Sequence, residues 1–288
     1  MIVTRFAPSP TGFLHLGHAY AALIGFETAH ATGGRFLLRI DDIYLTRCRP
    51  EYERAIFEDL RWLGLSWEEP VRRQSEHFAD YEAALEKLEA RGLLYPCFCT
   101  RKEIADEIAR AGIAPQLSEL GPEGPLYPGT CRTLSDETRA RRIAEAAPYA
   151  LRLDVAKARR LIGQALTFEE TGRGPNGETG VQVARPELLG DVVLARKELP
   201  ASYHLAVVVD DALQGVTLVT RGEDLFPATH IQRLLQALLD LPATAYAHHR
   251  LILDAAGRKF SKRDRAATLL ALRQSGATPK DVRSLIGM

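Results

Sequence analysis

The stretch that decides the fold is Val3-Thr-Arg-Phe-Ala-Pro-Ser-Pro-Thr-Gly12, followed closely by His15-Leu-Gly-His18. An apolar strand over residues 2–6 ends here, because two prolines and a glycine forbid an immediate helix. Good helix formers then continue to about residue 30, and a pair of glycines stops the helix. The next strand, residues 35–40, completes a βαβ unit, whose crossover we expect to be right-handed.

The rest of the chain shows the same α/β pattern on either side of a loop-rich segment. Apolar residues at three- and four-residue spacing predict helices, and runs of β-branched residues predict strands. The predicted helices are residues 50–63, 76–92 and 226–239, and the predicted strands are 203–209, 216–220 and 249–253. The run Tyr203-His-Leu-Ala-Val-Val-Val209 is nearly continuous, as expected for a strand that is buried on both faces.

Glycine and proline interrupt this pattern between the two halves. Residues 112–130 contain four prolines and four glycines, and residues 172–180 contain another four glycines. We therefore predict a doubly wound, Rossmann-like parallel α/β sheet that is split by an inserted loop-rich domain and followed by a short helical tail. The predicted segments are 1–96 and 188–240 for the two halves of the sheet domain, 97–187 for the insertion and 241–288 for the tail.

The composition is that of an ordinary globular protein. The 288 residues include 37 basic and 37 acidic side chains, so the formal net charge is zero. This balance argues against a protein coated in positive charge that wraps long duplexes, although it allows a local basic groove. No run approaches the roughly 18 apolar residues of a membrane span, and the N-terminus lacks the pattern of a signal peptide. We expect a cytoplasmic protein with no membrane partner.

The segment from Pro8 to His18 lies where open α/β sheets bind phosphates. Backbone N–H groups at a helix start are unpaired, and Gly17 allows a nucleotide to approach the backbone. His15 and His18 can donate hydrogen bonds to phosphate oxygens. Taken alone, the same residues are equally well explained by a Pro/Gly turn whose histidines cap the helix.

A second loop, Lys259-Phe-Ser-Lys-Arg263, follows the last predicted strand and places three cations around a serine. Such a run alone is most often a solvated basic loop. Paired with His15-Leu-Gly-His18, however, it resembles the lysine-containing signature loop of the class I aminoacyl-tRNA synthetases, and the first string resembles their histidine–glycine–histidine signature. Both strings occur in the right order at the two ends of a split α/β fold.

The flanking residues resemble the glutamyl-tRNA synthetases within this class. The run Thr4–Gly12 is similar to the opening of those enzymes, and Leu38-Arg-Ile-Asp-Asp42 is similar to their first acidic strand end. Tyr203–Asp211 and Thr220-Arg-Gly-Glu-Asp-Leu225 fit the second half of the same family. The resemblance covers nearly the whole chain and is weakest in the predicted insertion.

An amino acid with two carboxylates fits the charged residues of these motifs. Arg5 and Arg221 can offer bidentate guanidinium forks to the carboxylates, and Asp41 can hold the ammonium group. Tyr203 and Ser9 add hydroxyl contacts. Each arginine alone is more simply explained as part of a surface salt bridge, but together at strand ends they favour a glutamate pocket. Asp41 stands where the family more often has a glutamate, so we expect a small shift of the ligand or a bridging water.

The resemblance also implies an ATP site. It assigns catalysis to His15, His18 and Lys262, of which Lys262 neutralises phosphate charge, and it implies Mg²⁺ bound with ATP. The other residues that it places against ATP are Pro8, Gly17, Lys259 and Ser261. Phe260 and Arg263 depart from the usual signature, but neither change removes the lysine.

Only 26 residues follow Lys262, too few for the anticodon-binding region that glutamyl-tRNA synthetases carry there. The chain therefore resembles the short paralogues of that family, and this resemblance implies that it activates glutamate without tRNA. The same resemblance implies that the glutamyl group is then transferred to queuosine at the wobble position of tRNA(Asp), and we expect the protein to be a monomer. The alternatives are a truncated glutamyl-tRNA synthetase that charges tRNA(Glu), a non-catalytic protein that binds glutamate or ATP, and an adenylating ligase with a non-RNA acceptor.

Three cysteines in the predicted insertion, Cys97, Cys99 and Cys131, offer the thiolates of a zinc site. Tetrahedral zinc needs a fourth ligand, which these residues leave open because no histidine lies nearby in sequence. A cluster of reduced thiols is the alternative. The resemblance to the short paralogues implies that Tyr127 is the fourth ligand. We expect the zinc to be structural, since no open coordination position is evident, and Cys48 to be an ordinary thiol.

Overall fold

The first half of the sheet forms around the predicted βαβ unit. The computed structural model describes all of the chain except residues 111–119, 123, 197–198, 255–256 and 258–267. In it β1 (Val3–Phe6) and β2 (Arg35–Ile40) are parallel neighbours joined by α1 (Leu16–Ala31). The two-residue strand β3 (Arg72–Arg73) pairs in parallel with the end of β2. The βαβ prediction is confirmed, and the second strand has its predicted bounds.

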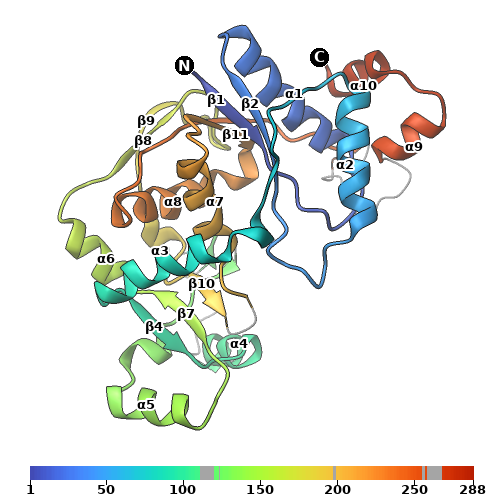
Figure 1. Ribbon diagram of the computed structural model, residues 1–288. Coiled ribbons are helices and arrows are strands. Elements are labelled where there is room, and N and C mark those ends of the chain that lie inside the picture. The colour runs from blue at the N-terminus through green and yellow to red at the C-terminus, as the bar shows by residue number, and fades with distance from the viewer. Residues whose placement is uncertain (111–119, 123, 197–198, 255–256, 258–267) are drawn as a thin grey trace.

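The second half of the sheet lies directly beside β1. Its strands run in the order β11 (Leu218–Gly222), β12 (Ala245–His249), β8 (Thr167–Glu170) and β9 (Gly180–Val183), all parallel except β9. The backbone N–H of Thr217 donates to the carbonyl oxygen of Val3 at 3.0 Å, which joins the two halves. Figure 1 shows β1, β2 and β11 side by side. The predicted parallel α/β sheet is therefore confirmed.

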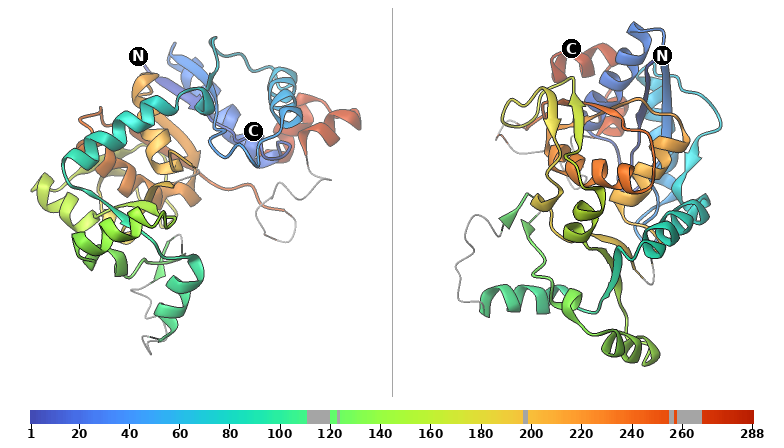
Figure 2. Two further views of the ribbon diagram at one scale, coloured as in Figure 1. Left: turned by 60° about the horizontal axis from the view of Figure 1, so that its bottom comes forward. Right: turned by 90° about the vertical axis from the view of Figure 1, so that its left-hand side faces the viewer.

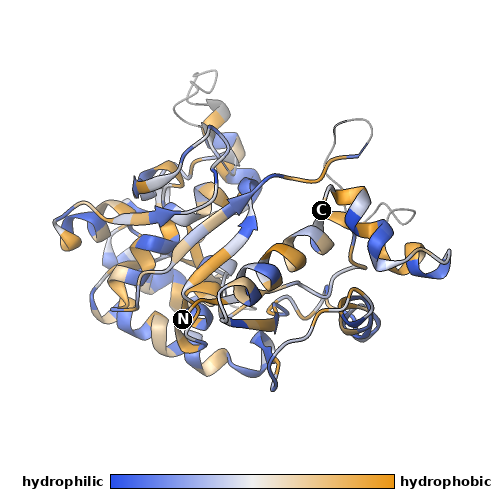
Figure 3. Cartoon of the chain, turned by 90° about the horizontal axis from the view of Figure 1, so that it is seen from above, coloured by the Kyte–Doolittle hydropathy of each residue, from blue (hydrophilic) through white to orange (hydrophobic). Residues whose placement is uncertain are grey.

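Side chains alternate across the sheet and bury both of its faces. Phe36 and Leu38 of β2 pack into the same apolar cluster as residues of α1, whereas Leu37 between them packs with Phe226 and Tyr246 on the other face. This alternation follows from the two-residue period of a strand. Seen from above in Figure 3, the central strands are correspondingly rich in apolar residues. The sheet is thus covered by helices on both sides, as in doubly wound folds.

The helices outside the βαβ unit fall into two groups. One group packs together on the lower side of the sheet in Figure 1 and contains α3 (Phe78–Ala90), α7 (Tyr203–Leu213) and α8 (Phe226–Leu238). The other group lies beside α1 and contains α2 (Pro50–Trp62), α9 (Leu269–Gln274) and α10 (Pro279–Ile286). The three helices predicted at 50–63, 76–92 and 226–239 are confirmed to within two residues at each end.

The predicted strand over residues 203–209 is wrong, because this run is the first part of helix α7. Every residue from His204 to Asp211 is buried, since α7 lies between α3 and α8. A helix enclosed in this way has no polar side facing solvent, so its sequence lacks the one-sided period that distinguishes a surface helix from a strand. The packing overrides the strand preference of three consecutive valines. The strand predicted at 249–253 also lies elsewhere, since β12 occupies residues 245–249.

A smaller antiparallel sheet forms the lower lobe of the molecule. Its strands are β4 (Leu94–Cys97), β7 (Ala150–Leu153) and β10 (Val193–Arg196), with β7 in the middle. The helices of this part of the chain are α4 (Arg101–Arg110), α5 (Asp136–Ala144) and α6 (Val155–Ile162). Figure 2 shows α4 and α5 on the side away from both termini. Strands β4 and β10 pair with β7, whereas β8 joins the main sheet. This pairing does not test the boundaries of the inserted domain at residues 97 and 187, which stay a prediction.

The remaining elements are short. They are β5 (Leu120–Gly121), β6 (Gly124–Pro125) and the 3-10 turns η1 (Gln74–Glu76), η2 (Thr130–Thr133), η3 (Pro186–Leu188) and η4 (Glu223–Leu225). Among the described helices, none combines the length and the hydropathy that crossing a membrane requires.

The turn between α1 and β2 gives a test of this packing. A Cβ atom added at Gly34 would lie 2.1 Å from the backbone oxygen of Ile2, so Gly34→Ala must displace the start of β1. We expect it to lower the free energy of unfolding by about 1–3 kcal/mol or more, as overpacking does. Urea denaturation measures this change. The neighbouring Gly33→Ala serves as the control, because nothing lies within 4 Å of its added Cβ and only the positive φ of 62° opposes it. A Gly34→Ala protein no less stable than Gly33→Ala would contradict the clash.

Candidate active site

The loop between β1 and α1 is tied to the end of β2. The carbonyl oxygen of Pro8 accepts a hydrogen bond from the backbone N–H of Asp41 at 3.1 Å, and that of Pro10 accepts one from Arg49 at 3.0 Å. Ser9 is half-buried in this loop. The predicted phosphate segment and the predicted acidic strand end therefore lie next to each other at the carboxyl edge of the sheet, where open α/β sheets bind ligands.

The two signature histidines lie against each other at the start of α1, with their rings tilted by 35°. The ring centroids of His15 and His18 are 3.8 Å apart, and the backbone N–H of His15 donates to Nδ1 of His18 at 3.2 Å. A Cβ atom at Gly17 would lie 3.1–3.2 Å from the His15 ring, so the glycine leaves room for that ring. The two histidines therefore cap the helix, which the sequence alone left open. The first backbone N–H groups of α1 lie at the same edge of the sheet.

The chain just after the second signature segment contacts this helix start. Lys259, Ser261 and Lys262 lie outside the described residues, as do Phe260 and Arg263. The chain just after them forms an antiparallel bridge between Thr268 and His15, and the backbone N–H of Leu269 donates to the carbonyl oxygen of Leu14 at 2.8 Å. Residues 14–15 and 268–269, about 250 residues apart in sequence, therefore lie side by side.

Arg221 and Tyr203 contact each other, as a shared pocket requires. Nη1 of Arg221 donates to the Tyr203 hydroxyl at 3.3 Å and to Oε1 of Gln232 at 2.8 Å, and Nη2 donates to the Thr229 hydroxyl at 2.7 Å. Its Nε donates to Nε2 of His248 at 3.1 Å. Arg221 is buried at the end of β11 and Tyr203 is the first residue of α7. Tyr203 therefore reaches the site from a helix rather than from the strand predicted for it.

Arg5 lies on the neighbouring strand β1 and is paired with an acid. Its Nε and Nη2 donate to the two carboxylate oxygens of Asp211 at 3.1 and 3.3 Å, and its Nη1 donates to the carbonyl oxygen of Thr220 at 3.4 Å. Burial would raise the pKa of the Asp211 carboxyl, but the charges of Arg5 and Arg39 outweigh it and hold that pKa below its usual value. The Arg5–Asp211 pair is therefore ionised.

Asp41 is linked to the same pair through a fully buried arginine. Arg39 donates from Nε to Oδ1 of Asp41 at 2.7 Å and from Nη1 to Oδ1 of Asp211 at 2.6 Å. Burial raises the pKa of the Asp41 carboxyl to about 6, against the opposing charge of Arg39. The two groups predicted to hold glutamate, Arg5 and Asp41, are thus parts of one charge network.

The sequence analysis missed several members of this network. Arg39, Asp210 and Asp211 are all buried, and Asp210 accepts hydrogen bonds from Arg72, Gln74 and Tyr81. The sequence did contain a signal for them: Arg39 lies within an apolar strand, and Asp210 and Asp211 end an apolar run. Charged residues in such positions are buried only when they are paired. The buried pair of Glu170 and His248 gave no such signal.

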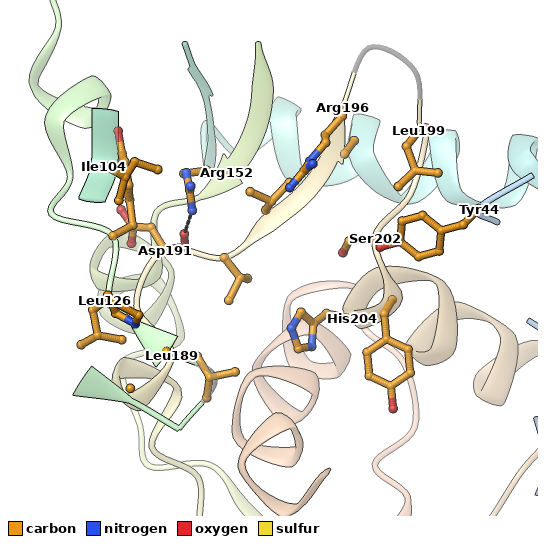
Figure 4. A pocket seen from close by; sticks show the side chains of 18 of the residues that line it. Tyr44, Ile104, Leu126, Arg152, Leu189, Asp191, Arg196, Leu199, Ser202 and His204 are labelled. Atoms are coloured by element: carbon orange, nitrogen blue, oxygen red, sulfur yellow. Dashed lines mark hydrogen bonds between the residues drawn. The ribbon is translucent and has the colours of Figure 1, made fainter. Parts of the chain in front are cut away.

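A cavity of about 490 Å³ adjoins Tyr203 between α7 and the lower lobe. Figure 4 shows Ser202 and His204 facing it from the start of α7, with Tyr44, Arg152 and Arg196 around it. Cavities of this size hold small ligands in other proteins. The sequence analysis predicted no cavity at this place.

The three predicted cysteine ligands lie together beside Tyr127, which lines the cavity. The ligand atoms of Cys97, Cys99 and Cys131 are all within 4.8 Å of one another, and the Cys99 and Cys131 sulfurs are 3.4 Å apart. The Tyr127 hydroxyl lies 3.6 Å from the Cys99 sulfur and accepts a hydrogen bond from the backbone N–H of Cys131 at 2.8 Å. Two sulfurs bound at ~2.3 Å to one tetrahedral zinc are about 3.8 Å apart, so the cluster fits zinc. Cys48 is half-buried and is in no disulfide.

Comparison with known proteins identifies the class that this sheet and these signature segments define. The family model for the catalytic domain of class I tRNA synthetases for Glu and Gln matches residues 1–286, and the chain belongs to this family. A crystal structure of a glutamate tRNA ligase from Elizabethkingia meningosepticum in complex with its amino acid superposes with a TM-score of 0.73 and 30% identity. That match covers 91% of this chain and 52% of the ligase.

Within the family the full-length similarity is to the glutamyl-Q tRNA(Asp) synthetases. The chain is 51% identical over 292 residues to that enzyme from Rhodobacter capsulatus, with all of both chains covered. It is 44% identical over 284 residues to the enzyme from Nocardia farcinica, covering 98% of this chain and 82% of the relative. The family resemblance drawn from the sequence is therefore confirmed.

Proposed function

We propose that the chain is an enzyme that activates glutamate with ATP and transfers the glutamyl group to queuosine in tRNA(Asp). The observation that carries the first half is the convergence of Arg5, Arg221 and Asp41 at the sheet edge beside the start of α1. The full-length similarity to glutamyl-Q tRNA(Asp) synthetases supports the acceptor. A glutamate--tRNA ligase from Aquifex aeolicus is 38% identical over 97% of this chain, so tRNA(Glu) is the acceptor to test against.

The proposed glutamate site uses charge of both signs. Arg5 and Arg221 bind the two carboxylates, Asp41 binds the ammonium group, and the Tyr203 and Ser9 hydroxyls complete the polar contacts. The contact between Tyr203 and Arg221 supports this assignment, as does the position of Arg5 on the strand next to β11. A dry cleft strengthens such ion pairs relative to water.

Activation then needs positioning and charge stabilisation. The α-carboxylate of glutamate attacks the α-phosphorus of ATP in line, which forms glutamyl-adenylate and releases pyrophosphate. The start of α1 with His15, His18 and Lys262 stabilises the phosphate charge, and Mg²⁺ would neutralise the departing pyrophosphate. The other residues that we propose contact ATP are Pro8, Gly17, Lys259 and Ser261. A hydroxyl of the queuosine cyclopentenediol then attacks the glutamyl carbonyl and AMP leaves.

We also propose that the cavity beside Tyr203 receives the acceptor base. The cavity is large enough for a modified base, and it begins at a residue of the glutamate site. The side chains of Tyr44 and Tyr203 offer ring faces, and Arg152 and Arg196 offer positive charge toward a phosphate backbone. This placement would bring the acceptor hydroxyl to the activated carboxylate.

A structural zinc ion completes the proposal. Cys97, Cys99 and Cys131 would hold it, and Tyr127 is the proposed fourth ligand because its hydroxyl lies 3.6 Å from the Cys99 sulfur. The ion would join Cys97 of β4 to Cys131 of the η2 turn. Four protein ligands leave no open position for catalysis.

The acceptor is tested by transfer of labelled glutamate to tRNA. We expect label on tRNA(Asp) that contains queuosine and none on unmodified tRNA(Asp) or tRNA(Glu). Lys262→Ala should lower both glutamate-dependent pyrophosphate exchange and transfer by roughly 100-fold or more, if it stabilises charge in the transition state. Label on tRNA(Glu) alone would make the chain a conventional charging enzyme, and absence of glutamate-dependent exchange would make it a binding protein.

The pKa of Asp41 predicts how glutamate binding depends on pH. Since that pKa is about 6, the carboxylate takes up a proton as the pH falls from 7 to 5 and loses its attraction for the ammonium group. We expect the KM for glutamate in pyrophosphate exchange to rise about 10-fold over this range, with little change in the KM for ATP. Asp41→Asn should show a raised KM at every pH. A KM for glutamate that stays constant in the wild-type enzyme would remove Asp41 from the site.

The zinc proposal predicts separate effects on stability and catalysis. Cys99→Ser should bind less zinc and unfold more easily, by about 3 kcal/mol when the wild-type protein is held at roughly 100 times its zinc Kd. The fraction that stays folded should still exchange pyrophosphate at a near-normal rate. Zinc content, thermal unfolding and exchange are measured on one preparation, with Cys48→Ser as the control thiol. Loss of exchange in fully folded, zinc-depleted protein would show that the metal does more than stabilise the fold.

A further inference from the structure

A buried imidazole and a buried carboxylate support the guanidinium of Arg221 from behind. Nε of Arg221 donates to Nε2 of His248 at 3.1 Å, and Nδ1 of His248 lies 2.5 Å from Oε2 of Glu170. The side chains of His248 and Glu170 are both 0% exposed. The three residues come from the adjacent strands β11, β12 and β8, so the chain of hydrogen bonds crosses the edge of the sheet.

The hydrogen-bonding chemistry fixes which imidazole nitrogen carries the proton. A guanidinium Nε–H can only donate, so Nε2 of His248 accepts, and the proton of the neutral ring is on Nδ1, which donates to Glu170. The other oxygen of Glu170 accepts the backbone N–H groups of His248 and Gly172, each at 2.9 Å. Both carboxylate oxygens are therefore held in place. Burial lowers the pKa of His248, which favours the neutral ring.

Arg221 keeps its positive charge for a ligand. Within the described part of the chain no carboxylate lies within ion-pair distance of it, whereas Arg5 is paired with Asp211. Four hydrogen bonds to His248, Tyr203, Gln232 and Thr229 use four of the five guanidinium N–H groups. One N–H on Nη2 remains for a substrate oxygen, and its direction is set by the other four.

We propose that Glu170 and His248 are positioning residues that orient Arg221 for the carboxylate of glutamate. This inference rests on the proposed function, because it takes Arg221 as a substrate contact. The negative charge of Glu170 selects the Nδ1–H form of His248. If residue 170 could donate instead, the ring proton would move to Nε2 and face the Nε–H of Arg221. The guanidinium would then lose an acceptor and turn from its place.

The test is Glu170→Gln, which keeps the shape of the side chain and removes its charge. We expect the KM for glutamate in pyrophosphate exchange to rise about 10-fold or more, as when a hydrogen bond to a charged group is lost. The KM for ATP should stay within about twofold, because the nucleotide does not contact Arg221 in this proposal. Glu169→Gln is the matched control, since Glu169 is adjacent and exposed and should leave every constant unchanged.

A second pair of variants decides the question if Glu170→Gln does not fold. His248→Gln retains an oxygen that can accept from Arg221 and an amide that can donate to Glu170, whereas His248→Leu retains neither. We expect His248→Gln to keep much of the affinity for glutamate and His248→Leu to lose it, with thermal unfolding measured on both. Equal KM values for glutamate in the two variants, or equal rises in the KM for glutamate and for ATP, would overturn the inference.

These results are distinguishable from failure of the proposed function. A wild-type enzyme without glutamate-dependent exchange removes the function and the inference together. A wild-type enzyme with normal exchange and a Glu170→Gln variant with an unchanged KM for glutamate removes only the inference.

Discussion

The interaction on which the rest of the structure depends is the pairing of Arg39 near the carboxyl end of strand β2. Its side chain is 0% exposed, and an unpaired charge there would be very costly. Asp41 and Asp211 accept its hydrogen bonds at 2.7 and 2.6 Å, and Oδ2 of Asp210 lies 3.6 Å from its Nε. Breaking such a buried pair typically costs about 3–5 kcal/mol, so the network fixes helix α7 against the sheet.

The same network prepares the site. Asp211 accepts hydrogen bonds from both Arg5 and Arg39. The position of Arg5, a proposed substrate contact, is therefore coupled to that of Arg39. Arg221, on the neighbouring strand β11, is held differently, by neutral groups and by the imidazole of His248. The two arginines therefore differ in net local charge, although both are proposed to bind one ligand. Rigid placement before the substrate arrives reduces the entropy lost on binding and reaction.

Much of the fold could be predicted from local patterns. The segment from Val3 to Asp42 combines strand, turn and helix signals that agree with one another, and the structure follows it closely. Residues 203–209 could not be predicted in this way, because burial between α3 and α8 removes the polar face by which a helix is recognised. Glu170 also carried no signal, since its partner His248 lies 78 residues away and nothing local marks either residue as buried.

The sequence by itself determined the family and the order of the segments that carry the chemistry. The reason is that the residues around His15 and Lys262 form short motifs, which can be recognised without knowledge of the fold. It also determined which donor atoms could bind zinc. Only the tertiary structure decided how charges are shared among Arg5, Arg39 and Asp211, and which neutral groups surround Arg221. The physical reason is that burial and hydrogen-bond geometry set the charge and direction of each group, and both arise from contacts between residues far apart in sequence.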